Sequence, residues 1–307
     1  MELLKKLSSI QGASSDEEEM KNFILSHIET NKANWKIKPK IIQGKNFQDC
    51  IILIFGDPKT AIYAHIDTIG FSVSHTNKLI PIGGPELIDG TILVGKDSFG
   101  EIETELLIIE TETNQYHLQC ILDRNIEPGT ILTFKPNFIN HKTHIQTPYL
   151  DNRLGVWNTL KLAENLEHGA IVFSTYEEHG GNSVAFCAKY LYNTYNITQA
   201  LISDITWTSS HIHTNKGVVI SLRDGSIPRR SYLKKIISLA KESGIPFQLE
   251  VESSGGSDGS YLQNSELPID WCFIGAACEN IHTPTETVSK KDIKHMLNMY
   301  THLIKNL

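Results

Sequence analysis

The chain has 307 residues, of which 40% are hydrophobic and 21% charged, a composition typical of a folded protein with a substantial core. Its 28 Lys and Arg against 35 Asp and Glu give a net charge of −7, and basic residues form no long run, which argues against nucleic acid as a partner. No apolar stretch approaches the roughly 18 residues needed to span a bilayer. We expect a cytoplasmic protein, because the amino terminus lacks the apolar segment of a secretory signal and the five scattered cysteines suit free thiols.

Two helices and two buried strands are expected at the start of the chain. Apolar residues recur on one face of residues 1–10, which predicts the first helix. The second helix is expected to begin in SSDEEEM with Ser14 or Ser15 as its N-cap, because the helix dipole favours acidic residues in a first turn. The apolar runs at 50–55 and 61–67 then read as short buried strands.

The segment from residue 71 to residue 147 has a different pattern. Short alternating runs of apolar and polar residues are separated by turn residues, with almost no helical periodicity. We expect an inserted all-β domain of about six strands there, a barrel or a sandwich.

After this segment, expected strands and helices alternate to the end of the chain. The expected helices are 151–167, 184–195, 231–244 and 290–306, and the expected strands are 170–176, 200–206, 217–223, 247–251 and 269–276. Such alternation favours an α/β fold, an open mixed sheet with helices on both faces. The sequence therefore predicts one discontinuous α/β domain, 1–70 and 148–307, that carries the β domain 71–147 in a loop.

Ionisable residues lie at or just after the expected strand ends, where α/β folds place their chemistry. They are His65, Asp67, Asp151, Glu177, Glu178, Asp204 and His282. Two imidazoles and several carboxylates form the mixture that holds Zn²⁺, Co²⁺ or Mn²⁺. Each residue alone has an ordinary structural explanation, such as a helix N-cap at Asp151. Together they favour a metal, which would supply the positive charge that adjacent Glu177 and Glu178 need.

The order of these residues resembles that of the co-catalytic dinuclear metallopeptidases, and within them the M42 family of cytoplasmic metalloaminopeptidases, which includes glutamyl and deblocking aminopeptidases. The matching segments are AHIDTIG, LDNRLGV, YEEHGG, the Asp of LISD, SSGGSDGSYLQ and NIHTPTETV, within residues 61–288. The expected β domain also lies in the long interval between His65 and Asp151, as in M42. The related M20 carboxypeptidases and deacylases insert their lid domain between the positions that match Asp204 and His282.

The resemblance implies a ligand set for two divalent metal ions per subunit, zinc or cobalt or else manganese. His65 and Asp204 would hold one ion. Glu178 and His282 would hold the other, and Asp151 would bridge both.

The resemblance also implies roles for the remaining residues and for partners. Glu177 would be the general base, and Asp67 would accept a hydrogen bond from His65 and raise its basicity. The protein would remove amino-terminal residues from short peptides as a homo-oligomer, with no nucleic acid or membrane partner. Thr68 stands where the family commonly has Glu, so the preferred residue stays open.

Three alternatives are weighed against this interpretation. An M20-type deacylase or carboxypeptidase would need an arginine for the substrate carboxylate. Arg153 alone stands beside the motifs, although Arg223 or Arg229 could reach the site through folding. A glycoside hydrolase would use a carboxylate pair without metal and would leave both histidines unexplained. A catalytically silent binding or scaffold relative would be expected to lack a ligand. His211, His213 and Asp258 stay unassigned between the cleft and a structural role.

Overall fold

The large sheet forms around the apolar runs at 50–55 and 61–65 in the computed structural model, which describes residues 1–110 and 116–307. Among the described residues, the main path of the sheet is, in spatial order, β1 (Lys40–Gly44), β2 (Gln48–Phe55), β12 (Gly169–Ser174), β3 (Ala61–His65), β13 (Gln199–Trp207), β16 (Asp270–Glu279), β17 (Thr287–Ser289), β11 (His144–Gln146) and β10 (Ile139–Asn140). A side branch is formed by β14 (Val218–Arg223), which pairs with β16, and β15 (Phe247–Val251), which pairs with β14.

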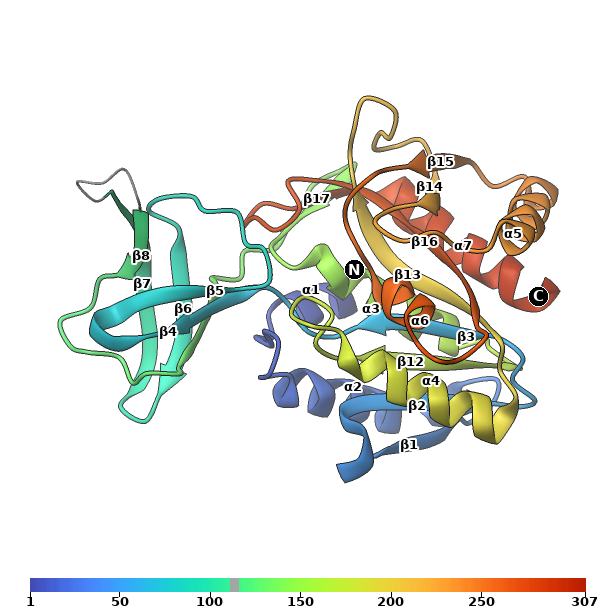
Figure 1. Ribbon diagram of the computed structural model, residues 1–307, viewed down its shortest axis with the longest axis horizontal. Coiled ribbons are helices and arrows are strands. Elements are labelled where there is room, and N and C mark those ends of the chain that lie inside the picture. Colours follow the sequence, from blue (N-terminus) through green and yellow to red (C-terminus); the bar gives the residue numbers. More distant parts are fainter. Residues whose placement is uncertain (111–115) are drawn as a thin grey trace.

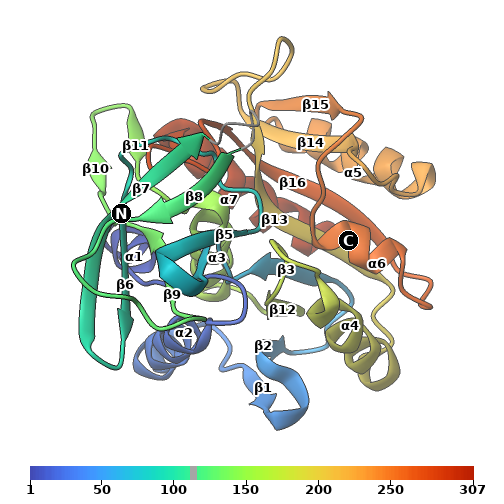
Figure 2. The ribbon, with the colours of Figure 1, turned by 60° about the vertical axis from the view of Figure 1, so that its left-hand side comes forward.

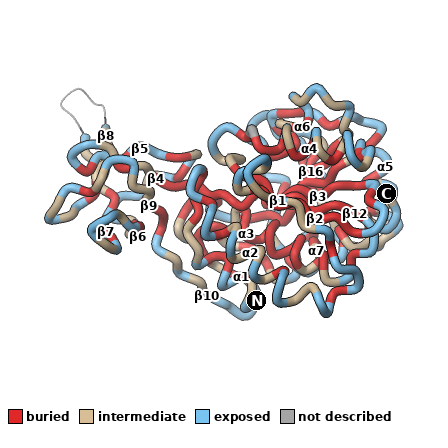
Figure 3. The backbone as a smooth tube through the Cα atoms, turned by 90° about the horizontal axis from the view of Figure 1, so that it is seen from below, coloured by how far each residue is buried: buried red, intermediate tan, exposed pale blue. Residues whose placement is uncertain are grey.

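Helices cover both faces of this sheet, as the sequence predicts (Figure 2). Along β2 the side chains of Ile51, Leu53 and Phe55 enter the larger core, and the residues between them enter the smaller one, because successive side chains of a strand point to opposite faces. The larger core is covered by α1 (Glu2–Ser8), α2 (Glu18–Asn31), α3 (Leu150–Ala163), α5 (Arg230–Ser243) and α7 (Lys290–Asn306), and the smaller core by α4 (Asn182–Tyr195) and α6 (Asp258–Gln263). Figure 3 shows the buried residues concentrated along the strands between these layers.

A small barrel lies beside this α/β part (Figure 1). As far as the chain is described, its strands close in the order β4 (Gly70–Val73), β5 (Lys78–Ile82), β8 (Tyr116–Cys120), β7 (Gly100–Glu110), β6 (Ile92–Asp97) and β9 (Ile131–Phe134). The inserted all-β domain is thus a barrel rather than a sandwich. The division at residues 70 and 148 stays a prediction, and the pairing of β10 and β11 with the large sheet favours a second boundary before Ile139.

The prediction of Ser14 or Ser15 as the N-cap of the second helix is wrong. The helix begins at Glu18, its N-cap is Glu17, and no side chain caps it. Ser14 instead donates a hydrogen bond to the buried carboxylate of Asp67, at 2.6 Å. The Ser14 hydroxyl therefore bonds to a residue that is distant in sequence and not to the first turn of the helix.

The short 3₁₀ turns η1 (Lys32–Asn34), η2 (Lys45–Phe47) and η3 (His75–Asn77) complete the described elements.

Two further expectations from the sequence can be compared with the structure. All five cysteines are buried free thiols. Across residues 1–110 and 116–307, we find no helix with the length and apolar character needed to cross a membrane.

The spacing between α3 and β13 depends on Gly155. A β-carbon at this position would lie 2.1 Å from the main-chain oxygen of Ser203 and 2.2 Å from Oδ1 of Asn152. Both neighbours are buried and hydrogen bonded to each other, so neither can move freely. Gly155 therefore lets α3 approach the strand that carries Asp204.

We predict that Gly155→Ala lowers the free energy of unfolding by about 1–3 kcal/mol, the usual cost of overpacking. Urea unfolding monitored by circular dichroism measures the change. Gly256→Ala is the matched control, because its β-carbon would meet nothing closer than Ser260 Oγ at 3.7 Å. Equal stability of the two variants would contradict this account of the α3–β13 contact.

Candidate metal centre

Parallel strands bring four of the candidate residues to one edge of the sheet. β12 runs parallel to β3 with Ser174 opposite His65, so the Glu pair at 177–178 emerges beside the end of β3. β13 is also parallel to β3, and the two strands pair as far as Ile202 and Tyr63, two residues before Asp204 and His65 respectively. The Nε2 atom of His65 lies 3.6 Å from Oδ2 of Asp204. Residues that are far apart in sequence thus meet because their strands share a direction.

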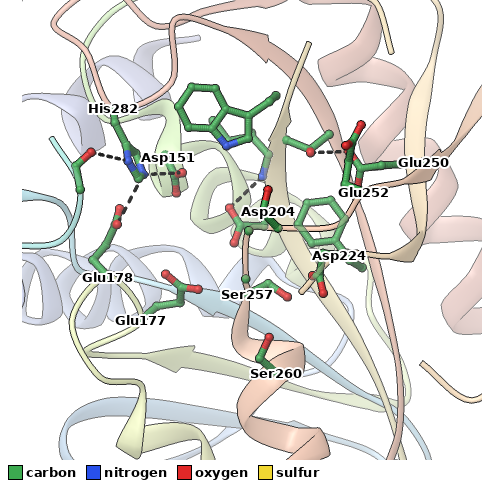
Figure 4. A pocket seen from close by; sticks show the side chains of 18 of the residues that line it. Asp151, Glu177, Glu178, Asp204, Asp224, Glu250, Glu252, Ser257, Ser260 and His282 are labelled. Atoms are coloured by element: carbon green, nitrogen blue, oxygen red, sulfur yellow. Dashed lines mark hydrogen bonds and ion pairs between the residues drawn. The ribbon is translucent and has the colours of Figure 1, made fainter. Parts of the chain in front are cut away.

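Asp151 lies between the two histidines, in the first turn of α3. Its backbone is not helical (φ −79°, ψ 105°), and the N-cap of the helix is Tyr149, so Asp151 does not serve as a cap. Its Oδ1 lies 3.1 Å from Nε2 of His65, and its Oδ2 lies 3.5 Å from Nε2 of His282. One carboxylate therefore contacts both imidazoles, one with each oxygen. Figure 4 shows the contact between Asp151 and His282.

His282 faces the site from the loop after β16. Its Nε2 lies 3.4 Å from Oε2 of Glu178, and its Nδ1 lies 2.9 Å from the main-chain oxygen of Gly84 in the barrel. Burial lowers the pKa of His282, but its hydrogen bond with Asp151 and the charge of Glu178 raise it to about 10. The His282 imidazole thus lies among carboxylates that favour its charged form.

Glu286 supports this loop, and the sequence interpretation did not single it out. Its carboxylate accepts hydrogen bonds from the main-chain N–H of Asp151 at 3.0 Å and of His282 at 2.8 Å. The residue is buried, and burial raises its pKa to about 8. It belongs to the NIHTPTETV segment, but only the fold shows that it joins two candidate ligands.

Asp67 is buried beneath the site and holds the Glu pair. Its Oδ1 accepts from the main-chain N–H of Glu177, and its Oδ2 accepts from that of Glu178, both at 3.1 Å. The Nδ1 of His65 lies 3.1 Å from the main-chain oxygen of Asp67 and 3.4 Å from its Oδ1. Although burial opposes its ionisation, the contact with His65 keeps the pKa of Asp67 below its usual value.

The cluster contains more carboxylates than imidazoles. Burial raises the pKa of Glu178 and of Asp204 well above the usual range, and the charge of Asp151 raises both further. Burial also raises the pKa of Glu177 to about 8. In Asp151 burial acts in the same direction, but hydrogen bonds to both imidazoles hold its pKa below the usual value. Carboxylates that repel one another in this way are stabilised by a cation among them.

The donor set fits a divalent metal ion. Ligand atoms of His65, Asp151 and Glu178 all lie within 4.8 Å of one another. Oε1 of Glu178 is buried and accepts no hydrogen bond from any residue that the structure describes. Burying a carboxylate oxygen without a hydrogen-bond donor or a cation beside it lowers the stability of the fold. Imidazole nitrogens with carboxylate oxygens suit zinc, cobalt or manganese.

The centre opens into a cleft of about 780 Å³. Its acidic lining residues are Asp151, Glu177, Glu178, Asp204, Asp224, Glu250 and Glu252. Among its described lining residues there is no Lys or Arg, and His282 is the sole basic group. Trp207 also lines the cleft and packs edge-on against His282, with ring centroids 5.7 Å apart. The cleft is therefore strongly negative.

The three unassigned residues lie away from the cleft lining. His211 and His213 are exposed in the loop after β13. Asp258 is buried at the start of α6, where it accepts a hydrogen bond from the Ser174 hydroxyl. It is not a cap, because the N-cap of α6 is Ser257. Burial raises the pKa of Asp258 to about 6.

Comparisons with known proteins agree with this geometry. The family model of the M42 glutamyl aminopeptidases matches residues 96–299. A putative aminopeptidase of Acetivibrio thermocellus is 24% identical over 340 residues, covering 99% of this chain and 98% of the other. The lysyl aminopeptidase of Pyrococcus furiosus is 26% identical over 295 residues, covering 81% of this chain and 82% of the other. The TET1 peptidase of Pyrococcus horikoshii, described as assembling into a tetrahedron or a large octahedral shell, superposes with a TM-score of 0.81 and 21% identity, covering 99% of this chain and 98% of the other.

We predict that Asp67→Asn weakens metal binding by about 10–100-fold, as expected when a group that supports a ligand is lost. Both oxygens of Asp67 accept hydrogen bonds from main-chain N–H groups. In either orientation, the NH₂ group of an asparagine at this position would face one of these N–H donors, and that hydrogen bond would be lost. Titration calorimetry with zinc measures the affinity. Ser14→Ala removes one hydroxyl donor to the same carboxylate and leaves both main-chain bonds, so its effect should be much smaller. Unchanged zinc affinity in Asp67→Asn would refute the supporting role.

Proposed function

This chain belongs to the M42 glutamyl aminopeptidase family, and we propose on that premise that it hydrolyses the first peptide bond of short peptides with two bound divalent cations. The observation that carries the proposal is the position of Asp151, whose two oxygens each contact a different imidazole. Glu178 and Asp204 lie on either side of it, next to His282 and His65 respectively. This symmetric set suits two neighbouring ions that share one carboxylate.

We propose that His65 and Asp204 bind one cation. Glu178 and His282 bind the second, and Asp151 bridges the two. When bound, zinc, cobalt or manganese would supply Lewis acidity toward the attacking water and the scissile carbonyl.

Glu177 is proposed as the general base. Its side chain lines the cleft and is 14% exposed, and its Oε2 lies 4.0 Å from Nε2 of His65. Glu177 lies outside the cluster of closest ligand atoms, and its main-chain N–H is held by Asp67. The carboxylate can therefore take a proton from water as the carbonyl is attacked and give it to the leaving amine.

The charge of the cleft favours the amino end of the substrate. The α-amino group of a peptide is cationic, and the described lining of the cleft is acidic without Lys or Arg. Arg153, the candidate clamp for a substrate carboxylate, is fully buried and donates to the main-chain oxygens of Ile66 and Ile10. Arg229 is paired with Asp270. These positions support an aminopeptidase over an M20-type carboxypeptidase.

Two alternatives have less support. A silent binding relative would be expected to lack a ligand, but every candidate ligand faces the same centre. A metal-free glycosidase would use only a pair of carboxylates, so it would give no role to the two histidines that contact Asp151. The fold is shared with a peptidase described as assembling into a tetrahedron or a large octahedral shell, so we also propose a homo-oligomer.

We predict that Glu177→Gln lowers kcat by about 10²–10⁴-fold while zinc binding stays intact, because the amide cannot accept a proton. Hydrolysis of an aminoacyl coumarin and metal content are measured on the same sample. Glu178→Gln is the matched control, and it should lose metal as well as activity. A near-normal rate in Glu177→Gln would show that another group is the base.

We predict that one short peptide is cleaved when free and when C-amidated, but resists cleavage when N-acetylated. Acetylation removes the cationic group that the acidic cleft is proposed to bind, whereas amidation changes only the distant end. Liquid chromatography of the products measures the three rates. Efficient cleavage of the acetylated peptide, with loss of cleavage on amidation, would favour the carboxypeptidase instead.

A further inference from the structure

A second set of carboxylates lines the cleft beyond the proposed catalytic groups. The set consists of Asp224, Glu250 and Glu252, called here the distal acidic set. Figure 4 shows it across the cleft from His282 and Glu178. The proposed metal chemistry uses none of its members, so their presence in the cleft needs another explanation.

Two parallel strands of the side branch position this set. Asp224 directly follows β14, Glu250 lies within β15, and Glu252 directly follows β15. Because β14 and β15 are parallel, both strands end at the same edge of the sheet, beside the cleft. The N–H of Gly225 donates to the main-chain oxygen of Gly255 at 3.1 Å, which ties together the two loops that follow. The distal acidic set thus stands on a fixed frame.

Among the residues that the structure describes, the most buried member, Glu250, forms no ion pair with a Lys, Arg or His. It is 4% exposed, and its Oε1 accepts a hydrogen bond from the Thr206 hydroxyl at 2.6 Å. Burial raises its pKa, and the nearby charges of Glu252 and Asp224 raise it further. Asp224, which is 7% exposed, is held by the main-chain N–H of Ser226 at 2.6 Å. Carboxylates that are buried beside one another are costly without a cation.

The set is spread more widely than a metal site. Within the described residues, the ligand atoms that converge within 4.8 Å are those of His65, Asp151 and Glu178. The distal acidic set lines the same cleft as Phe273, and Ser221 lies between Phe273 and Glu250 in the paired strands. An apolar ring beside separated carboxylates suits a cation at the end of an aliphatic chain.

We propose that the distal acidic set receives the side chain of the amino-terminal residue of the substrate, and that this side chain is cationic, a lysine or an arginine. The inference rests on the proposed aminopeptidase function, which places the scissile bond at the metal centre. The aliphatic part of the side chain packs against Phe273, and its ammonium or guanidinium donates to Glu250 and Asp224, with Glu252 at the exposed rim. A substrate with an acidic side chain is repelled, and a neutral aliphatic one leaves Glu250 without a cation.

The test compares substrates that differ in charge and little in shape. The metal-loaded full-length protein is assayed with coumarin amides of lysine, arginine, norleucine and glutamate. We expect kcat/KM for lysine to exceed that for norleucine by at least about tenfold, the effect of a charged hydrogen bond. In Glu250→Gln and, separately, Asp224→Asn, the ratio of lysine to norleucine should fall about 10–100-fold.

A matched control separates local contacts from overall charge. Glu266 is exposed and does not line the cleft, so Glu266→Gln removes one negative charge elsewhere. Its lysine-to-norleucine ratio should equal that of the unmodified protein. An equal fall of the ratio in Glu266→Gln and Glu250→Gln would overturn the proposal in favour of a general charge effect.

A binding measurement keeps the subsite testable apart from turnover. Calorimetry with L-lysinamide and L-norleucinamide should show tighter binding of lysinamide, and Glu250→Gln should abolish the difference. If norleucine or glutamate is hydrolysed as well as lysine, the subsite proposal fails while the aminopeptidase function stands. If no substrate is hydrolysed, the proposed function fails, and equal binding of the two amides would overturn the subsite as well.

Discussion

The site depends on one buried carboxylate, that of Asp67. A buried carboxylate must be surrounded by donors, and these donors come from separate parts of the chain. Ser14 reaches it from the segment before α2, and the N–H groups of Glu177 and Glu178 reach it from the loop after β12. The requirement to satisfy a single buried charge therefore fixes the Glu pair beside the end of β3, where His65 stands.

The same constraint orders the charges above it. The main-chain N–H groups of Glu177 and Glu178 donate to Asp67, and the side chains of both residues point into the cleft (Figure 4). Glu178 meets His282, while Glu177 stays outside the closest group of ligand atoms. Two adjacent residues of the same type thus have different surroundings, which is what the proposed roles of ligand for Glu178 and base for Glu177 require.

The sequence predicted most of the strands and helices and the candidate ligands, because both depend on local patterns. A continuous apolar run marks β2, apolar periodicity marks α7, and the motif residues lie at or just after strand ends. The failures share a physical cause. Ser14 has the sequence position of a helix cap but donates a hydrogen bond to a residue 53 positions away, and Glu286 accepts hydrogen bonds from the main-chain N–H groups of two candidate ligands. The distal acidic set likewise depends on the pairing of β14 with β15, which no spacing along the chain encodes.

The contact between His282 and the barrel determines which ring nitrogen keeps its proton when the imidazole is neutral, as it must be to bind a metal ion. Nδ1 lies 2.9 Å from the carbonyl oxygen of Gly84, in the loop between β5 and β6. A carbonyl oxygen only accepts hydrogen bonds, so Nδ1 is the protonated nitrogen and the lone pair of the neutral ring lies on Nε2, which faces Glu178 and Asp151. The inserted barrel thereby selects the tautomer of a side chain in the α/β part. Replacing the barrel with a short linker would free the ring to exchange its two nitrogens, and a proton would then compete for the Nε2 position that the proposed metal ligation requires.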